Sequence, residues 1–228
     1  MTIVRVTSKI AEQHVSLHQI FSHIAQIYDR MSNVMSFGLV HYWRWRAARA
    51  LRLDAGEIGL DLGTGTTDFA LALLRASDPK SHLIGIDYAP AMLTLGRSKL
   101  QRRGATEWIE LRLGNVEHLD LPNNSVDCCY SAFLLRNLTD LPQGLREMLR
   151  VVRPNGHILC LEISHPPGNL FRRLFYSYFY CCTPFFSTLL GQKFNANYLA
   201  QSLKISIMHP NCKRLWKHVA GMMCTISI

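Results

Sequence analysis

The chain has 228 residues, 48% of them hydrophobic, which is enough for one α/β domain with a complete core and indicates a globular protein. Its 25 Lys and Arg residues outnumber the 16 Asp and Glu residues, and the formal net charge of +9 favours an anionic partner without identifying it. The seven cysteines lack the CxxC spacing of a zinc site, so we predict reduced thiols, a cytosolic-type compartment and no metal.

The start of the chain carries no recognisable targeting pattern. Residues 1–20 lack the uninterrupted apolar core of a secretion signal and the arginine-rich, acid-poor composition of a transit peptide, so we expect no export. The sequence HYWRWRAARALRL at residues 41–53 predicts a basic helix whose two tryptophans suit a membrane interface. Nucleic acid is the weaker alternative, because Ala and Leu recur at core spacing and no separate basic domain or aromatic platform accompanies them.

Short apolar segments alternate with helical patterns along the rest of the chain. The expected strands are Ile58–Leu62, His82–Asp87, Ile109–Leu113, Val126–Ser131 and His157–Ile163. The expected helices between them are Thr66–Ala76, Pro90–Arg103 and Asp140–Val152, the last of which ends before RPNG. This repetition predicts an α/β fold, Rossmann-like, with a parallel sheet covered by helices on both faces. A ligand would then bind beyond the carboxyl ends of the strands, near the switch point of the sheet.

The sequence GLDLGTGTTD at residues 59–68 predicts a nucleotide-binding turn. Gly63 and Gly65 match the first two glycines of GxGxxG, whereas Asp68 stands in the third position. Asp87, at the end of the next strand, suits the ribose hydroxyls of either NAD or S-adenosylmethionine. Asp61 favours the second cofactor, because a carboxylate beside the turn repels a pyrophosphate and attracts the ammonium of an amino acid. The alternative is an ordinary tight turn with Asp61 as a buried helix-capping acid.

Six motifs together resemble a known family. They are FSHIAQIYDRMSNVMSFGLVHYWR (residues 21–44), LDLGTGTTD, GIDYAPAML, GNVEHLDLP, LLRNLTD and LEISHP. Their order and spacing, from about residue 21 to residue 210, resemble the C-methyltransferase family of ubiquinone and menaquinone biosynthesis. The first motif and LRN are fairly specific to that family, whereas the glycine turn is not. The resemblance implies a class I S-adenosylmethionine-dependent enzyme that methylates the ring of a prenylated quinol.

The resemblance also implies which residues hold the cofactor. Gly63 and Gly65 would allow close backbone approach. Side chains or backbone that would contact S-adenosylmethionine are Thr66, Asp87, Asn115, Val116 and Ser131, in addition to Asp61. The family often has glycine where Thr67 stands.

The LLRNLTD motif supplies the expected catalytic residues. Arg136 would stabilise the quinol oxyanion, directly or through the water that takes the proton, and Asn137 would bond the ring oxygen. The alternative for Arg136 is an ion pair with Asp140 that holds the loop. Tyr28, in the segment that resembles the family's lid, is the expected substrate contact.

Two other residue groups have weaker expectations. His165 in ISHP is a minor base candidate, and the other histidines are scattered and assigned to no metal. Met31 and Met35 are expected to be core contacts at helical spacing.

We expect a single methyltransferase domain over residues 1–228. Its expected parts are a helical lid (1–55), a cofactor-binding core (56–165), a helical insert (166–210) and a short divergent tail (211–228). The insert is aromatic-rich at residues 169–190 and would receive the prenyl tail and meet lipid phosphate through Arg172 and Arg173; a dimer interface or core helix pair is the alternative. The family continues beyond MHP (residues 208–210) with a helix and two closing strands. Here we expect a helix and at most a stub of strand, so the C-terminal strands of the fold should be shortened.

The expected partners follow from this organisation. They are a prenylated quinol and an anionic membrane surface, with a homodimer or a quinone-biosynthesis complex as open alternatives, and no nucleic acid. The expected location is cytoplasmic and peripherally membrane-associated. Two other functions stay open: a non-catalytic S-adenosylmethionine-binding scaffold of a quinone-biosynthesis complex, and a methyltransferase for a small untailed aromatic acceptor.

Overall fold

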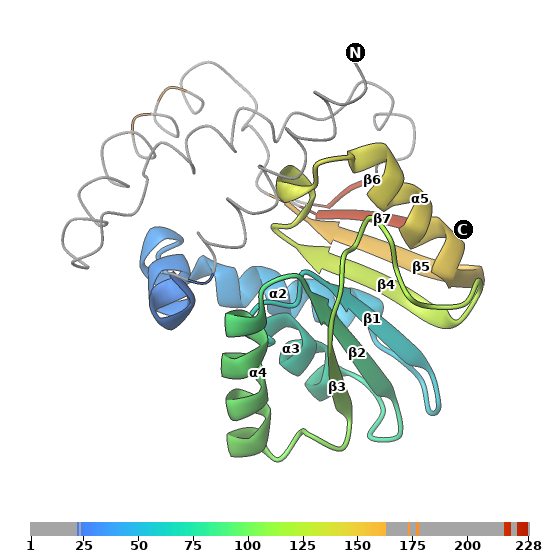
Figure 1. Cartoon of the computed structure of the whole chain (residues 1–228), viewed down its shortest axis with the longest axis horizontal. Helices are drawn as coiled ribbons and strands as arrows, with labels where there is room; N and C mark the ends of the chain where they lie inside the picture. The colour runs from blue at the N-terminus through green and yellow to red at the C-terminus, as the bar shows by residue number, and fades with distance from the viewer. Residues whose placement is uncertain are drawn as a thin grey trace, which may run out of the picture.

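The computed structural model of the chain describes residues 22, 24–162, 173, 177, 217–219 and 223–227. This part contains a seven-stranded sheet with the order β3-β2-β1-β4-β5-β7-β6 (Figure 1). The strands are β1 (Ile58–Leu62), β2 (His82–Asp87), β3 (Ile109–Leu113), β4 (Val126–Ala132), β5 (Val152–Leu161), β6 (Lys217–Val219) and β7 (Met223–Ser227). The first five are parallel, and β7 is antiparallel to both β5 and β6. The predicted α/β class with a Rossmann-like parallel sheet is confirmed.

Helices cover both faces of the sheet, as Figure 1 shows. A helix at residues 24–35 precedes α2 (Leu39–Leu51), and α3 (Asp68–Ala76) and α4 (Pro90–Arg103) follow β1 and β2. α2, α3 and α4 pack on one face through one apolar cluster, and α5 (Leu141–Val151) packs on the other through a second cluster. The short 3-10 helix η1 (Leu135–Asn137) lies between β4 and α5.

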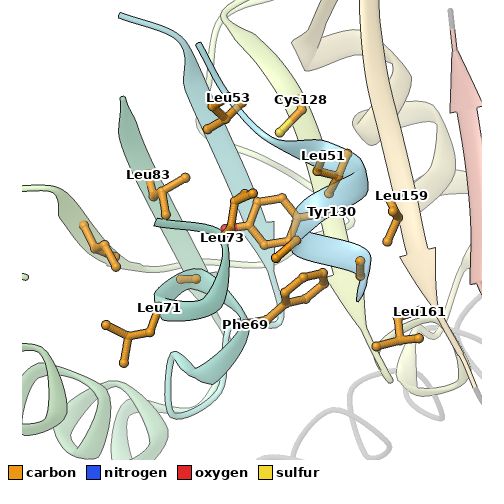
Figure 2. Close-up of a cluster of buried hydrophobic side chains, with 14 of the residues drawn as sticks. Leu51, Leu53, Phe69, Leu71, Leu73, Leu83, Cys128, Tyr130, Leu159 and Leu161 are labelled. Atoms are coloured by element: carbon orange, nitrogen blue, oxygen red, sulfur yellow. The ribbon is translucent and has the colours of Figure 1, made fainter. Parts of the chain in front are cut away.

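Alternation along the central strands divides the core between the two faces. In β4, Cys128 and Tyr130 belong to the cluster beneath α2 and α3, whereas Cys129 belongs to the cluster beneath α5. Figure 2 shows Tyr130 against Phe69 of α3, with ring centroids 4.8 Å apart and planes at 66°. Burial raises the pKa of Cys128 to about 12, so its thiol stays protonated.

β1, β2, β3 and α4 have the bounds that the sequence predicts, but β5 does not. It begins at Val152 instead of His157, because the RPNG segment stays in the sheet as a β-bulge and does not leave it as a turn. The pairing with β4 shifts between Val126↔Val152 and Cys128↔His157, and Asn155 takes a left-handed φ of 66°.

The end of the chain closes the sheet. The prediction of a helix with at most a stub of strand is wrong for residues 217–219 and 223–227, where β6 and β7 pair as antiparallel strands. β7 pairs with β5 from Leu161↔Met223 to His157↔Ser227 and so covers the edge that β5 would otherwise expose. The strands are short, with three and five residues, as the fold prediction has them.

Candidate functional site

A cleft lies beyond the carboxyl ends of the parallel strands, at the switch point where the sheet order reverses beside β1 and β4. Each of four strands sends the loop that follows it into this cleft. The residues from these loops are Gly63 and Gly65 after β1, Asp87, Tyr88 and Ala89 after β2, Asn115, Val116 and Glu117 after β3, and Ala132, Phe133 and Leu134 after β4. The cleft therefore collects side chains that are far apart in the sequence.

The glycine turn approaches the cleft with bare backbone. Gly63 and Gly65 have φ angles of 63° and 53°, in the left-handed region that glycine takes without strain. A Cβ on Gly63 would lie 2.7 Å from Cδ1 of Leu134, so a side chain there would strike the opposite wall of the cleft. Thr67, where the family often has glycine, takes a left-handed φ of 71° and is fully buried, with its hydroxyl donating to the carbonyl of Thr66.

Asp87 connects the turn to the start of α4. One carboxylate oxygen accepts from the amide of Gly65 at 2.7 Å, and the other accepts from the amide of Ala89 at 2.8 Å. Burial raises the pKa of Asp87 above its usual value, and these backbone amides oppose the increase. The two hydrogen bonds fix the carboxylate at the rim of the cleft.

Asp61 lies behind the turn and does not line the cleft. Its side chain is buried and accepts a hydrogen bond of 2.8 Å from the hydroxyl of Thr64. Burial raises the pKa of Asp61 to about 7, against the opposing effects of the Thr64 hydrogen bond and the charge of Arg44. A cation bound nearby would favour the ionised carboxylate.

The raised pKa of Asp61 predicts a pH-dependent penalty on folding. Between pH 4 and pH 7 the unfolded chain loses this proton while the folded chain keeps it, so the free energy of unfolding falls as the pH rises. The loss levels off above pH 7 at about 4 kcal/mol, because the pKa of Asp61 rises from 3.8 in the unfolded chain to about 7 in the folded one. Asp61→Asn should remove this loss. We therefore expect urea titrations to show that the free energy of unfolding of the variant, relative to that of the unmodified protein, increases from pH 4 to pH 8. Exposed Asp54→Asn is the control, and a pH-independent difference for Asp61→Asn would contradict the assignment.

The loop after β4 carries Arg136 on η1. Arg136 Nη1 lies 3.3 Å from Oε2 of Glu162, both side chains are 10% exposed, and the guanidinium carbon is 5.7 Å from the ring centroid of Phe133. Burial raises the pKa of Glu162, and the Arg136 charge opposes this. The alternative ion pair with Asp140 is wrong: Asp140 caps α5 by accepting from the amide of Gln143.

The predicted site residues divide into two groups. Those that line the cleft are Tyr28, Gly63, Gly65, Asp87, Asn115, Val116 and Asn137. Those that do not line it are Asp61, Thr66, Ser131 and Arg136. Ser131 is fully buried, and its hydroxyl has no hydrogen-bond partner among the described residues. Thr66 is buried and donates to Oδ1 of Asp29 at 2.5 Å. The cofactor and catalytic roles of all these residues stay predictions.

The sequence reasoning missed part of the lining. The missed residues are Tyr88, Ala89, Met92, Glu117, Ala132, Phe133, Leu134 and Leu138. Each lies at the end of a strand, in the segment that follows it or at the start of the next helix, so proximity to the predicted strand ends was the available signal. His165 and the aromatic segment at 169–190 lie outside the described residues, apart from the exposed positions 173 and 177.

The described residues offer neither a metal site nor a membrane-spanning helix. They contain no group of three or more His, Cys, Asp or Glu side chains arranged to hold a metal ion. No helix among them combines the length and the apolar character needed to cross a bilayer.

The sheet order and the cleft define the fold of an S-adenosylmethionine-dependent methyltransferase. A solved structure titled as a putative enzyme of this kind, from Methanococcus maripaludis, superposes with a TM-score of 0.61 over 90% of this chain and 92% of that chain, at 15% identity. The model of the ubiE/COQ5 methyltransferase family matches residues 7–223, and the chain belongs to that family. It is therefore a methyltransferase whose methyl donor is S-adenosylmethionine.

Curated relatives agree with this membership. The ubiquinone/menaquinone biosynthesis C-methyltransferase UbiE of Geobacter sulfurreducens is 34% identical over 195 residues, which are 86% of this chain and 76% of the relative. The demethylmenaquinone methyltransferase of Geobacillus kaustophilus is 38% identical over 178 residues, or 78% of this chain and 76% of the relative.

Proposed function

We propose that the chain transfers a methyl group from S-adenosylmethionine to a ring carbon of a prenylated quinol in ubiquinone or menaquinone biosynthesis. One observation carries the proposal: a single cleft joins the glycine turn to the loop of Asn137, so that donor and acceptor sites are contiguous. The names of the Geobacter and Geobacillus relatives support a quinone nucleus as the acceptor.

The half of the cleft beside the turn fits the methyl donor. Gly63 and Gly65 leave room for close approach, and each Asp87 oxygen keeps lone pairs that can accept from ribose hydroxyls beyond its bond to a backbone amide. Asn115 Oδ1 accepts from the amide of Glu117 at 2.9 Å, which orients the side-chain NH2 group as a donor for the adenine edge. Buried Val116 beside it supplies an apolar surface for the base.

The other half of the cleft fits an aromatic acceptor. Phe133, Leu134 and Leu138 give it an apolar wall, and Tyr28 enters from the N-terminal helix. Asn137 adds an amide to this wall; its Nδ2 donates to the carbonyl of Phe133 at 3.3 Å, and the side chain would also bond a ring oxygen of the quinol. A wall of this composition favours a flat, largely apolar ring with one polar edge.

S-adenosylmethionine supplies a methyl group that is already activated on a sulfonium cation. The chain then has to hold the ring carbon in line with that methyl group and to favour loss of the proton from a neighbouring ring hydroxyl. The positive charge of Arg136, one residue before Asn137, would stabilise the developing oxyanion or the water that takes the proton. Asn137 would hold the oxygen in place.

Incubation of the protein with methyl-labelled S-adenosylmethionine and a short-chain demethylated quinol tests the proposal. We expect label on a ring carbon of the quinol. Binding without transfer would favour the non-catalytic scaffold, and transfer only to untailed aromatic acceptors would favour the small-acceptor enzyme. Either result would contradict the proposed substrate.

We infer in addition that the face around α2 rests on an anionic membrane surface, where a prenylated quinol resides. Large apolar side chains gather there on the surface, with Phe37 73% exposed; the others are Val34, Leu39, Tyr42 and Trp45. Arg46, Arg49 and Arg52 are exposed beside them, and the guanidinium of Arg49 lies 5.1 Å from the Trp45 ring centroid. Aromatic and basic side chains in one surface suit the headgroup region of a bilayer.

Vesicle sedimentation tests this surface. Phe37→Ser combined with Trp45→Ser should weaken binding to phosphatidylcholine vesicles that contain phosphatidylglycerol, because the variant loses apolar area that would enter the interface. Leu149→Ser is the matched control, since Leu149 is 49% exposed on α5, which covers the opposite face of the sheet. Equal binding of both variants and the unmodified protein would contradict the inference.

A further inference from the structure

Lys99 connects three segments beside the cleft, although its own side chain does not line the cleft. It lies near the end of α4, and its Nζ is 2.7 Å from Oδ2 of Asp29, 2.6 Å from Oδ1 of Asp68 and 3.0 Å from Oγ1 of Thr66. Its side chain is only 16% exposed. These contacts reach the N-terminal helix, the first turn of α3 and the glycine turn.

The partners of Lys99 are next to the walls of the cleft. Asp29 directly follows Tyr28, and Thr66 directly follows Gly65. The Thr66 hydroxyl also donates to Asp29, so the carboxylate of Asp29 receives a hydrogen bond from the turn as well as the ammonium of Lys99. The backbone on either side of the cleft is therefore held together by one set of polar contacts.

The charges in this set are balanced. Asp68 also receives Arg44 Nη1 at 3.0 Å, so two carboxylates meet two cations. Loss of Lys99 would leave Asp29 without its cationic partner in the set and Asp68 with Arg44 alone. The link to the N-terminal helix is the one that then weakens, because Asp68 keeps its second ion pair.

Apolar packing also holds this helix against α4. Ile24, Ala25 and Met31 form a small cluster with Ala89 and Met92 from the start of α4. This cluster is much smaller than the two clusters on the faces of the sheet. A helix attached by few buried contacts belongs to the segments that open at low free energy, so a polar link adds a large share of its stability.

We propose that Lys99 is a positioning residue that latches the N-terminal helix to the glycine turn and so sets Tyr28 over the bound methyl donor. The proposal rests on the proposed function for the identity of the ligand. A ligand that requires the closed helix binds with an apparent affinity equal to its intrinsic affinity multiplied by the fraction of closed protein. Lys99 would therefore raise the affinity for S-adenosylmethionine without touching it.

The test uses S-adenosylhomocysteine, measured by calorimetry, together with hydrogen exchange of the ligand-free protein. We expect Lys99→Met to weaken binding by about 10-fold through loss of the closed population. Amides of residues 24–35 should exchange faster, while those of β1 and β4 stay protected. Lys99→Arg should restore most of the affinity, because it keeps the cation.

Two further variants sharpen the test. Lys80→Met is the matched control, since Lys80 is exposed just before β2, at the opposite end of that strand from the cleft. Asp29→Asn should resemble Lys99→Met, and the double variant should lose less than the sum of the two single losses, because the residues share one link.

Unchanged affinity and exchange in Lys99→Met would overturn the proposal, and so would faster exchange throughout the sheet, which would show a general structural role. Failure of the proposed function looks different. If the unmodified protein binds S-adenosylhomocysteine but never methylates a quinol, the affinities and exchange rates of the Lys99 variants still test the positioning role of Lys99. If it does not bind S-adenosylhomocysteine at all, the hydrogen exchange of residues 24–35 still shows whether Lys99 holds the N-terminal helix against the glycine turn.

Discussion

Arg136→Ala should lower the rate of quinol methylation by about 100-fold or more and leave the affinity for S-adenosylhomocysteine nearly unchanged. Removal of a single group that stabilises developing negative charge costs this much in enzymes that use such groups. The affinity should persist because Arg136 lies on η1, beyond β4, and directs its ion pair to Glu162 and not to the glycine turn. Single-turnover kinetics with labelled cofactor separate the two quantities.

The ion pair with Glu162 complicates this experiment. Removal of Arg136 leaves a carboxylate that is 10% exposed without its cation, and breaking a buried pair in this way costs about 3 kcal/mol of stability. The lower rate would then include the effect of a disturbed loop. Arg136→Ala combined with Glu162→Gln avoids this outcome, because the neutral amide needs no cation and can still accept from the amide of Leu135.

The comparison of variants decides the role of Arg136. If it acts on the substrate, the double variant should regain stability and stay slow, while Glu162→Gln alone should keep most of the rate. The methylation rate of Arg136→Lys should lie between the rates of Glu162→Gln and of the double variant, since lysine keeps a charge but lacks the planar guanidinium. Equal slowing by Glu162→Gln and Arg136→Ala would instead assign Arg136 to support of the loop.

The sequence predicted the parallel part of the sheet because its central strands, β1 and β4, are buried along most of their length. Such strands are nearly continuous apolar runs, and the glycine turn and proline-started α4 mark the boundaries of the neighbouring segments. β5 was predicted less well, since proline, asparagine and glycine in RPNG usually end a strand, whereas here they form a bulge within it. The closing hairpin was missed because its pairing with β5 is a contact between distant parts of the chain.

Position along a strand predicted one part of the site, and the family resemblance predicted Tyr28 and Asn137, which also line the cleft. Asp87 and Asn115 follow strand ends, and their places in the cleft come from the sheet itself. The partner of Arg136 was not predictable in this way, because Glu162 lies after β5 and the nearer Asp140 was the obvious acid in the sequence. Lys99 reads as one of several basic residues at a helix end, and only the packed structure shows its link to Asp29.

Asp87 is where we expect the largest effect on cofactor binding. Its carboxylate accepts from the amides of Gly65 and Ala89 and faces the cleft that both residues line. In Asp87→Asn an NH2 group would replace one of the two carboxylate oxygens. It would then face the backbone N–H of Gly65 or Ala89, which is also a donor, so that hydrogen bond would be lost. The variant would lose a charge-assisted bond to the ribose as well as one link in the turn.

Hydrogen bonds to a charged group contribute about 1.5–3 kcal/mol each, so Asp87→Asn should weaken S-adenosylhomocysteine binding by at least about 10-fold. Calorimetry of the unmodified protein and the variant measures the loss. Asp120→Asn is the control, because Asp120 is an exposed acid in the loop before β4. Binding that is unchanged in Asp87→Asn would contradict the predicted role.

A ligand without the ribose hydroxyls separates the two ways in which Asp87 can act. The 2′,3′-dideoxy analogue of S-adenosylhomocysteine should bind more weakly than the parent to the unmodified protein, because the carboxylate then has no hydroxyl to accept from. In Asp87→Asn the difference between the two ligands should shrink, which is the coupling that a double-mutant cycle measures. If Asp87 only holds the turn, the substitution weakens both ligands equally and the difference between them persists. The ribose contact therefore predicts coupling, whereas support of the turn predicts additivity.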